Sequence, residues 1–174
     1  MDKKVILISI DGLRPDAVET CGHPFVNTLR ENGCYSPDAS SVVPPVTLPA
    51  HTSIFYSVPP TRHGIITNDY MPPVRPIRGL AEQLERADKT CAAFYGWEPM
   101  RHVWTSGNMK YSLFVNEYEE DNSDLLLTQE ALSLIERKEP DFVYLYLVET
   151  DDKGGHDHGW MTSEYMHRVN NAFS

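Results

Sequence analysis

The chain has 174 residues, a length that suits one domain with a sizeable hydrophobic core. Hydrophobic residues make up 41% of it and charged residues 23%, which is an ordinary globular composition. The formal net charge of −10 argues against a broad binding surface for a nucleic-acid polymer or an anionic membrane, so a phosphate-bearing ligand would need local positive charge such as a metal ion.

The first predicted element is a strand. Val5 to Ile10 is an almost continuous apolar run rich in β-branched residues, which predicts a strand buried on both faces, as in the centre of a parallel sheet. Asp11 follows at once, so a carboxylate stands where open α/β sheets place their chemistry. A strand-end Asp can also simply cap the next turn. A helix is expected from Pro24 to Arg30, with Gly33 as its stop.

The same amino-terminal run does not have the pattern of a signal peptide. It is short, ends at Asp11 and is followed by no small-residue cleavage site. No window of the sequence approaches a membrane span. The cysteines show no metal-ligand spacing, which favours reduced thiols: Cys21, Cys34 and Cys91. We therefore expect a soluble, cytoplasmic protein.

A proline-stiffened loop then turns into a helix at Thr47. Pro49 suits the first helical turn, where a missing N–H costs nothing. Thr47 falls near the N-cap, where free backbone N–H groups and the positive end of the helix dipole converge. A hydroxyl at this place can be a plain helix cap or a nucleophile. The other motifs have to decide between the two.

Further elements follow from periodicity. An amphipathic helix is indicated by apolar residues at i, i+3, i+4 and i+7: Ile77, Leu80, Ala81 and Leu84. Cys91 to Tyr95 is a short apolar run that predicts a second buried strand. Residues 96–122 are rich in aromatic side chains and leave two alternatives open, short strands or a lid or insertion. Those aromatic side chains could bind a nucleotide base, although core packing is their usual role.

The last third of the chain again predicts helices that alternate with a strand. A helix ending at Pro140 is predicted by an apolar stripe: Leu127, Ala131, Leu134 and Ile135. Phe142 to Leu147 has the character of a third strand, and a last helix begins near Thr162 or Ser163. Strands that alternate with helices predict an α/β three-layer sandwich with a mostly parallel central sheet. Such a sheet can bring the ends of its first and third strands together.

Candidate metal ligands follow the third strand. Asp152 and His156 are residue types that bind Zn²⁺ and related divalent ions, and Gly154 and Gly155 between them let the backbone fold tightly. An isolated Asp-x-x-x-His can also be an ordinary surface loop, since turns favour Asp and Gly. Its placement after a buried strand, like that of Asp11, favours a shared site.

Four motifs in series span almost the whole chain: Ile8-Ser9-Ile10-Asp11-Gly12-Leu13-Arg14-Pro15-Asp16, Thr47-Leu48-Pro49-Ala50-His51, His63-Gly64-Ile65-Ile66-Thr67-Asn68 and Asp152-Lys153-Gly154-Gly155-His156-Asp157-His158-Gly159. In type and order they resemble the nucleotide pyrophosphatase/phosphodiesterase family of the alkaline phosphatase superfamily. The resemblance implies an alkaline-phosphatase-like fold and a hydrolase that acts on phosphodiester or pyrophosphate bonds of nucleotide-type substrates.

The resemblance also implies roles for individual residues. Asp11 would bind one of two divalent metal ions, Zn²⁺ in kind, and Thr47 would be the nucleophile bound to the same metal. Asp152 and His156 would hold the second metal. Asn68 would donate to a phosphoryl oxygen together with the backbone N–H that follows Thr47. Metal coordination is one route to a reactive threonine alkoxide, and a phospho-threonine intermediate would follow.

The chain departs from the family pattern in its metal ligands. The family completes the two metal sites with an adjacent Asp-His pair and a further His, for which this sequence has no matching positions. We therefore expect residues 1–174 to be the amino-terminal part of one catalytic domain, with reduced metal occupancy, impaired turnover and a sheet edge open to self-association. Two alternatives remain: a phosphonate or phosphomonoester hydrolase that uses the same Thr47, and an inactive binding module.

Overall fold

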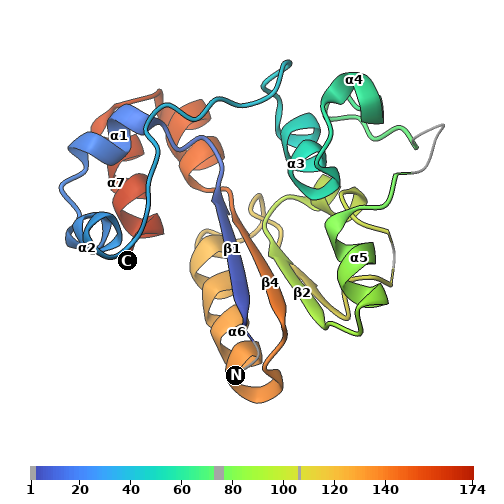
Figure 1. The fold of residues 1–174 in the computed structure, drawn as a ribbon. Coiled ribbons are helices and arrows are strands. Elements are labelled where there is room, and N and C mark those ends of the chain that lie inside the picture. Colours follow the sequence, from blue (N-terminus) through green and yellow to red (C-terminus); the bar gives the residue numbers. More distant parts are fainter. Residues whose placement is uncertain (1–2, 73–76, 106) are drawn as a thin grey trace.

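The centre of the fold is a parallel β-sheet (Figure 1). The computed structural model describes residues 3–72, 77–105 and 107–174. Within these ranges the sheet has four strands in the order β1-β4-β2-β3. Their bounds are β1 Val5–Ile10, β4 Phe142–Leu147, β2 Cys91–Tyr95 and β3 Tyr111–Phe114. All three strand pairs are parallel, as the sequence predicted.

The register of β1 and β4 aligns the two strand ends that carry chemistry. Ile10 pairs with Leu147, and the backbone N–H of Asp11 donates to the carbonyl oxygen of Leu147 at 2.9 Å. The chain that leaves β1 and the chain that leaves β4 therefore emerge side by side. This confirms the expectation that the first and third predicted strands meet.

Helices cover both faces of the sheet, which confirms the three-layer α/β sandwich. On one face α3 (Thr47–Tyr56) and α5 (Leu80–Arg86) pack against alternate β4 side chains: Phe142, Tyr144 and Tyr146. On the other face α6 (Ser123–Lys138) packs through Leu127 and Ala131 against the remaining β4 side chains: Val143, Leu145 and Leu147. The period-two alternation of β4 thus splits the core into two layers.

The remaining elements flank this sandwich. They are α1 (Pro15–Thr20), α2 (Pro24–Asn32), α4 (Pro60–His63), the 3₁₀-helix η1 (Glu98–His102), the π-helix η2 (Thr150–His156) and α7 (Ser163–Ala172). A small core of Ala17, Tyr165 and Val169 joins α1 to α7. No helix in the described ranges is both long and apolar enough to span a membrane.

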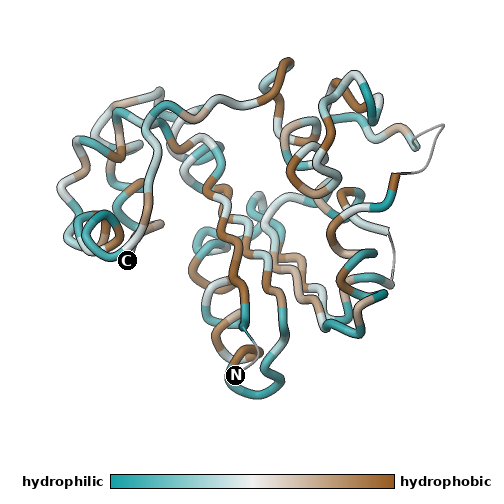
Figure 2. Tube along the Cα trace, in the orientation of Figure 1, coloured by the Kyte–Doolittle hydropathy of each residue, from teal (hydrophilic) through white to brown (hydrophobic). Residues whose placement is uncertain are grey.

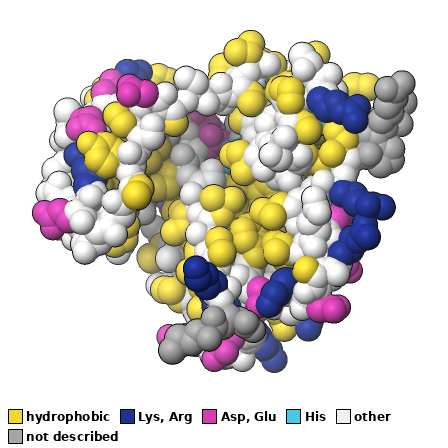
Figure 3. Space-filling view, in the orientation of Figure 1, with side chains coloured by type: hydrophobic (Ala, Val, Ile, Leu, Met, Phe, Trp, Pro, Cys, Tyr) yellow, Lys and Arg dark blue, Asp and Glu magenta, His cyan; other side chains and the backbone are white. Residues whose placement is uncertain are grey.

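The burial of β1 differs from the prediction. β1 is an outer strand of the described sheet, so the expectation of burial on both faces is wrong. Val5, Ile6 and Ile8 are 53%, 53% and 54% exposed. The strand is hydrophobic along its length (Figure 2), and Figure 3 shows hydrophobic side chains gathered over the sheet on the face in view. Apolar composition alone does not tell an inner strand from an outer one.

Residues 96–122 contain a short strand, the first of the two alternatives. β3 lies in this segment and pairs with β2. Trp104 is only 8% exposed and packs against Tyr95 and Phe55 in the main core. Residue 106 of this segment lies outside the described ranges. The assignment of residues 1–174 to one catalytic domain stays a prediction. Among the aromatic side chains of this segment, Trp104 serves core packing, whereas Tyr118 is 71% exposed.

Candidate active site

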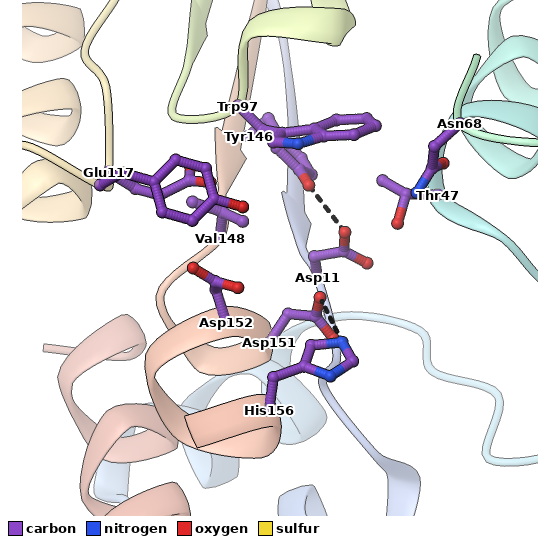
Figure 4. Close-up of a pocket in the computed structure, with 11 residues that line it drawn as sticks. Asp11, Thr47, Asn68, Trp97, Glu117, Tyr146, Val148, Asp151, Asp152 and His156 are labelled. Atoms are coloured by element: carbon purple, nitrogen blue, oxygen red, sulfur yellow. Dashed lines mark hydrogen bonds and ion pairs between the residues drawn. The ribbon is translucent and has the colours of Figure 1, made fainter. Parts of the chain in front are cut away.

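The residues singled out in the sequence meet in one pocket at the carboxyl ends of β1 and β4 (Figure 4). Its volume is about 160 Å³, and its lining includes all five predicted site residues: Asp11, Thr47, Asn68, Asp152 and His156. They come from four separate segments of the chain. The topology of the sheet, with β1 beside β4 and α3 over one face, brings these segments together.

Thr47 is the first residue of α3 and not its cap. The N-cap is Val46, and the cap position makes no side-chain hydrogen bond to the helix. In Figure 4 the Thr47 side chain faces the Asp11 carboxylate across the pocket. The capping explanation for Thr47 is therefore excluded, and its hydroxyl stands at the N-terminal, positive end of the α3 helix dipole.

Asn68 lies beside the start of α3. Its Oδ1 accepts a hydrogen bond of 3.0 Å from the backbone N–H of Leu48, the residue after Thr47. These two groups were expected to donate jointly to a phosphoryl oxygen, and in the structure they are bonded to each other. The Asn68 amide NH₂ then remains as the donor.

The loop that carries Asn68 is anchored by a buried histidine. The backbone N–H of Ile65 donates to His63 Nδ1 at 3.1 Å, so the proton is on Nε2, which lies 2.9 Å from the hydroxyl of Ser53 on α3. The His63-Gly64-Ile65 motif thus has a structural role, because it ties the Asn68 loop to the nucleophile helix.

A buried tyrosine holds Asp11 in place. The phenol of Tyr146 on β4 donates to Asp11 Oδ2 at 2.7 Å, and the backbone N–H of Gly12 donates to Oδ1 at 3.1 Å. Burial, followed by the charge of Asp11, raises the pKa of Tyr146 well above its usual value. The phenol therefore stays a donor. The sequence assigned Tyr146 only to a strand.

His51 connects β1 to the first turn of α3. One ring nitrogen, Nδ1, lies 2.8 Å from the carbonyl oxygen of Thr47, and Nε2 lies 2.9 Å from the hydroxyl of Ser9. The ring is 4% exposed, and burial lowers its pKa, which favours the neutral form. A neutral ring with Nδ1 protonated donates to Thr47 and accepts from Ser9. This arrangement fixes the backbone of Thr47.

The loop after β4 forms a π-helix, η2, which brings Asp151 to His156. Asp151 Oδ2 lies 3.5 Å from His156 Nε2. Asp151 also packs closely against Gly12, because a Cβ added to Gly12 would lie 2.6 Å from Asp151 Oδ1. Asp152 lines the same pocket on the side of Glu117 (Figure 4). Sequence reasoning missed Asp151, and the assignment of Asp152 and His156 to one metal stays a prediction.

The carboxylates of the pocket crowd one another. Burial, and then the charge of Asp11, raises the pKa of Asp151 to about 6. Burial, and then the charge of Asp157, raises the pKa of Asp152. Such crowding favours a bound cation, and carboxylate, imidazole and hydroxyl are donor types that suit Zn²⁺. Within the described ranges, however, no three His, Cys, Asp or Glu side chains already lie close enough together to hold a metal ion.

Glu117 is a second pocket residue that sequence reasoning missed. Its side chain is 2% exposed, and neither carboxylate oxygen has a hydrogen-bond partner within the described part of the chain. Burial, followed by the charges of Asp152 and Asp124, raises its pKa to about 8. The sequence signal was weak, since Glu117 stands in a polar stretch with no motif.

Comparisons with known proteins agree with the motifs. A family model for type I phosphodiesterase/nucleotide pyrophosphatase matches residues 5–172. Rat ectonucleotide pyrophosphatase/phosphodiesterase family member 1 is 26% identical over 182 residues, which are 92% of this chain and 20% of that protein. The chain therefore spans about a fifth of that relative's length.

Solved structures share the fold. Murine ectonucleotide pyrophosphatase/phosphodiesterase 5, as an inactive variant in complex with AMP, matches with a TM-score of 0.80 at 20% identity, over 98% of this chain and 50% of that one. Phosphonoacetate hydrolase from Sinorhizobium meliloti 1021, in complex with phosphonoformate, matches with a TM-score of 0.68 at 18% identity, over 99% of this chain and 52% of that one.

Proposed function

The chain belongs to the type I phosphodiesterase/nucleotide pyrophosphatase family, and from that premise we propose that it carries the nucleophile of a metal-dependent phosphodiester or pyrophosphate hydrolase. One observation carries the proposal: Thr47 opens α3 at the wall of a pocket that also holds Asp11, Asp151 and His156. A hydroxyl at a helix N-terminus that faces carboxylates in a pocket is placed for attack on a bound phosphoryl group.

Four residues of this chain have proposed roles in phosphoryl transfer. Thr47 Oγ1 gives its proton to water and bonds to phosphorus as the bond from phosphorus to the leaving oxygen breaks, and that oxygen takes a proton from water. A second water then attacks the phosphorus of the phospho-threonine, which releases the phosphate product and restores the Thr47 hydroxyl. The free NH₂ of Asn68 donates to a phosphoryl oxygen and stabilises the charge that develops there. Tyr146 orients Asp11, and His51 holds the Thr47 backbone. Each contact fixes a reacting or binding group before substrate arrives.

Two divalent metal ions, Zn²⁺ in kind, fit the donor types of the pocket. We propose Asp11, Thr47, Asp152 and His156 as ligands, as the resemblance implies, and Asp151 as a further carboxylate donor because its Oδ2 lies 3.5 Å from His156 Nε2. Bound metal would lower the pKa of the Thr47 hydroxyl and neutralise the phosphate charge. With so few ligands for two ions, we expect weak occupancy and slow turnover from residues 1–174 alone.

The proposed substrates are small phosphate diesters or nucleotides. The net charge of −10 disfavours a nucleic-acid polymer, and the small pocket suits a phosphoryl group with a modest substituent. A phosphonate substrate would use the same Thr47. Assays with a panel of phosphodiesters, nucleotides and phosphonates distinguish these substrate classes. A protein that binds nucleotides but no Zn²⁺ would instead be an inactive binding module.

The exposed outer strand supports a second proposal, which concerns assembly. Val5, Ile6 and Ile8 leave an apolar strand with an unpaired edge in the described sheet, so we expect self-association of residues 1–174. Sedimentation at rising concentration tests this, and a monomer throughout would refute it.

The hydrolysis proposal is tested with bis(4-nitrophenyl) phosphate and Zn²⁺. Turnover that disappears with a chelator and in Thr47→Ala supports it. Turnover that survives the Thr47→Ala substitution contradicts the nucleophile assignment.

A further inference from the structure

The start of η2 is held by a buried carboxylate from a different element. Asp124, the second residue of α6, is 9% exposed. Its Oδ1 accepts a hydrogen bond of 2.9 Å from the backbone N–H of Val148, and its Oδ2 accepts one of 3.1 Å from the backbone N–H of Glu149. One carboxylate therefore satisfies two successive backbone donors at the junction where β4 has ended and η2 is about to begin.

Glu149 holds Asp124 in return. Its Oε1 accepts from the hydroxyl of Ser123 at 3.1 Å and from the backbone N–H of Asp124 at 3.4 Å. Two cations balance the pair, since Arg168 Nη1 lies 3.1 Å from Glu149 Oε2 and Lys153 Nζ lies 3.6 Å from Glu149 Oε1. Each residue of the Asp124–Glu149 pair thus accepts a hydrogen bond from the backbone of the other, and the pair joins α6 to η2 and α7.

The Asp124 carboxylate is ionised at neutral pH. Burial raises its pKa to about 6, although the hydrogen bond from the Val148 N–H acts in the opposite direction. Both oxygens therefore remain acceptors, and hydrogen bonds to an ionised carboxylate are stronger than those between neutral groups. The junction between β4 and η2 is held by such charge-assisted bonds.

The residue that Asp124 holds also begins the π-helix. The carbonyl oxygen of Val148 accepts from the backbone N–H of Asp151 at 3.0 Å and from that of Asp152 at 3.1 Å. The two carboxylates that project from η2 into the active-site pocket are therefore bonded, through their own backbone, to the junction that Asp124 fixes (Figure 4). Asp124 lies outside the lining of that pocket, so its influence on the site passes through the backbone.

We propose that Asp124, together with Glu149, is a positioning residue for the metal-binding carboxylates of η2. This inference rests on the proposed function, in which Asp151 and Asp152 bind a divalent cation. Ligands that are already in place lose less freedom on binding than mobile ones do, and outer contacts of this kind change metal affinity by about 10–100-fold. A purely structural role would instead change the stability of the fold and leave the folded site as it is.

Asp124→Asn tests the inference by isothermal titration calorimetry with Zn²⁺ at neutral pH. The substitution keeps the shape of the side chain but leaves one acceptor oxygen, so one of the two backbone N–H groups loses its partner. We expect the Zn²⁺ affinity to fall by at least about tenfold. Glu164→Gln is the matched control, because Glu164 Oε1 lies 3.4 Å from Arg168 Nε but belongs to α7 and not to the junction. It should change the affinity by less than about twofold.

A second readout needs no metal. In chelator, the NMR signal of the Trp160 indole N–H, assigned with Trp160→Phe, reports on the far end of η2. The indole ring lies edge-on to His156, with 5.6 Å between the ring centroids, and packs closely against Gly155. The signal should move in folded Asp124→Asn and stay in place in Leu134→Ala, which removes a core contact from α6 away from the junction. Loss of stability alone therefore cannot imitate the expected result.

Ser123→Ala carries the same test if Asp124→Asn does not fold. It removes the hydroxyl that orients Glu149 and should lower the Zn²⁺ affinity by at least about threefold, because one hydrogen bond contributes less than an ionic contact. An indole signal that stays in place in the folded variant would overturn the inference, and so would a Zn²⁺ affinity within about twofold of that of the wild type. A wild-type protein that binds no Zn²⁺ would contradict the proposed function, and the indole signal would still decide whether Asp124 positions η2.

Discussion

Nε2 of His156 lies 3.5 Å from Oδ2 of Asp151, one turn of the π-helix η2 apart. A π-helical turn holds more residues than an α-helical turn, and such turns are frequent at functional sites. Here the wider turn carries Asp151 under Gly12, next to Asp11, and leaves Asp152 on the side of Glu117. The two adjacent aspartates therefore face different parts of the pocket.

The first prediction concerns these two aspartates. Asp151→Asn should weaken Zn²⁺ binding by at least about tenfold, because the substitution removes a charged donor beside His156. Asp152→Asn, the matched change one residue away, should weaken Zn²⁺ binding by a similar factor, because Asp152 is the other proposed carboxylate donor beside His156. Isothermal titration calorimetry measures both affinities, and a loss in Asp152→Asn alone would limit the ligands to those predicted from the sequence pattern.

The second prediction concerns the close contact between Gly12 and Asp151. Gly12 and Gly22 both have positive φ angles, 63° and 67°, so alanine at either position carries similar backbone strain. Only at Gly12 would the new Cβ meet another residue, 2.6 Å from Asp151 Oδ1. Gly12→Ala should therefore cost about 1–3 kcal/mol more than Gly22→Ala in the free energy of unfolding.

Urea denaturation of the two glycine variants measures that difference. Zn²⁺ binding should also fall in Gly12→Ala and not in Gly22→Ala, because Asp151 must move. Equal stabilities and equal affinities would mean that the approach of Gly12 to Asp151 has no consequence.

The third prediction tests the hydrogen bond between Tyr146 and Asp11. Tyr146→Phe removes the donor to a carboxylate and should cost about 1–3 kcal/mol of stability. Tyr144, two residues earlier on the same strand face, is buried with no hydrogen-bond partner for its hydroxyl in the described ranges. Tyr144→Phe should therefore be nearly neutral. Thermal unfolding measures the stability of both variants. Equal losses of stability in Tyr146→Phe and Tyr144→Phe would argue against a special role for the Tyr146 phenol.

Much of the fold could be predicted because local patterns agree with it. The strand bounds Val5–Ile10, Cys91–Tyr95 and Phe142–Leu147 appear in the sequence as apolar runs, and Leu127 and Ala131 mark the buried stripe of α6. The exposure of β1 could not be predicted, since burial depends on which strands flank it and not on its own residues. The cytoplasmic location stays a prediction.

The site was predicted only where motifs mark it. Asp11, Thr47, Asn68, Asp152 and His156 do line one pocket. Asp151 was missed because the spacing argument assumed a compact Asp-x-x-x-His turn, whereas the loop forms a π-helix. Glu117 and Tyr146 were missed because their positions depend on tertiary contacts between segments distant in sequence, which no local pattern records.

The fourth prediction is a pH dependence that comes from Glu117. Its pKa is raised from 4.5 to about 8 in the folded protein. Between these values the unfolded chain has lost the proton and the folded chain has kept it, so stability falls as pH rises and levels off above about pH 8. Glu117→Gln cannot lose this proton. Its stability relative to wild type should therefore rise from pH 4.5 to 8, by up to a few kcal/mol.

Denaturation curves at several pH values measure this effect. Glu119→Gln, an exposed neighbour, should track wild type throughout. Parallel pH profiles for wild type and Glu117→Gln would show that burial of Glu117 does not shift its proton affinity.

The central claim is that Thr47 is the nucleophile, and trapping its phosphoryl adduct tests it most directly. The protein is mixed with Zn²⁺ and bis(4-nitrophenyl) phosphate, quenched in acid, digested and analysed by mass spectrometry. The account predicts one added 4-nitrophenyl phosphoryl group on the peptide that contains Thr47, and none on it in Thr47→Ala. A Thr47 peptide that stays unmodified while the substrate is hydrolysed, or an adduct on another residue, would contradict it.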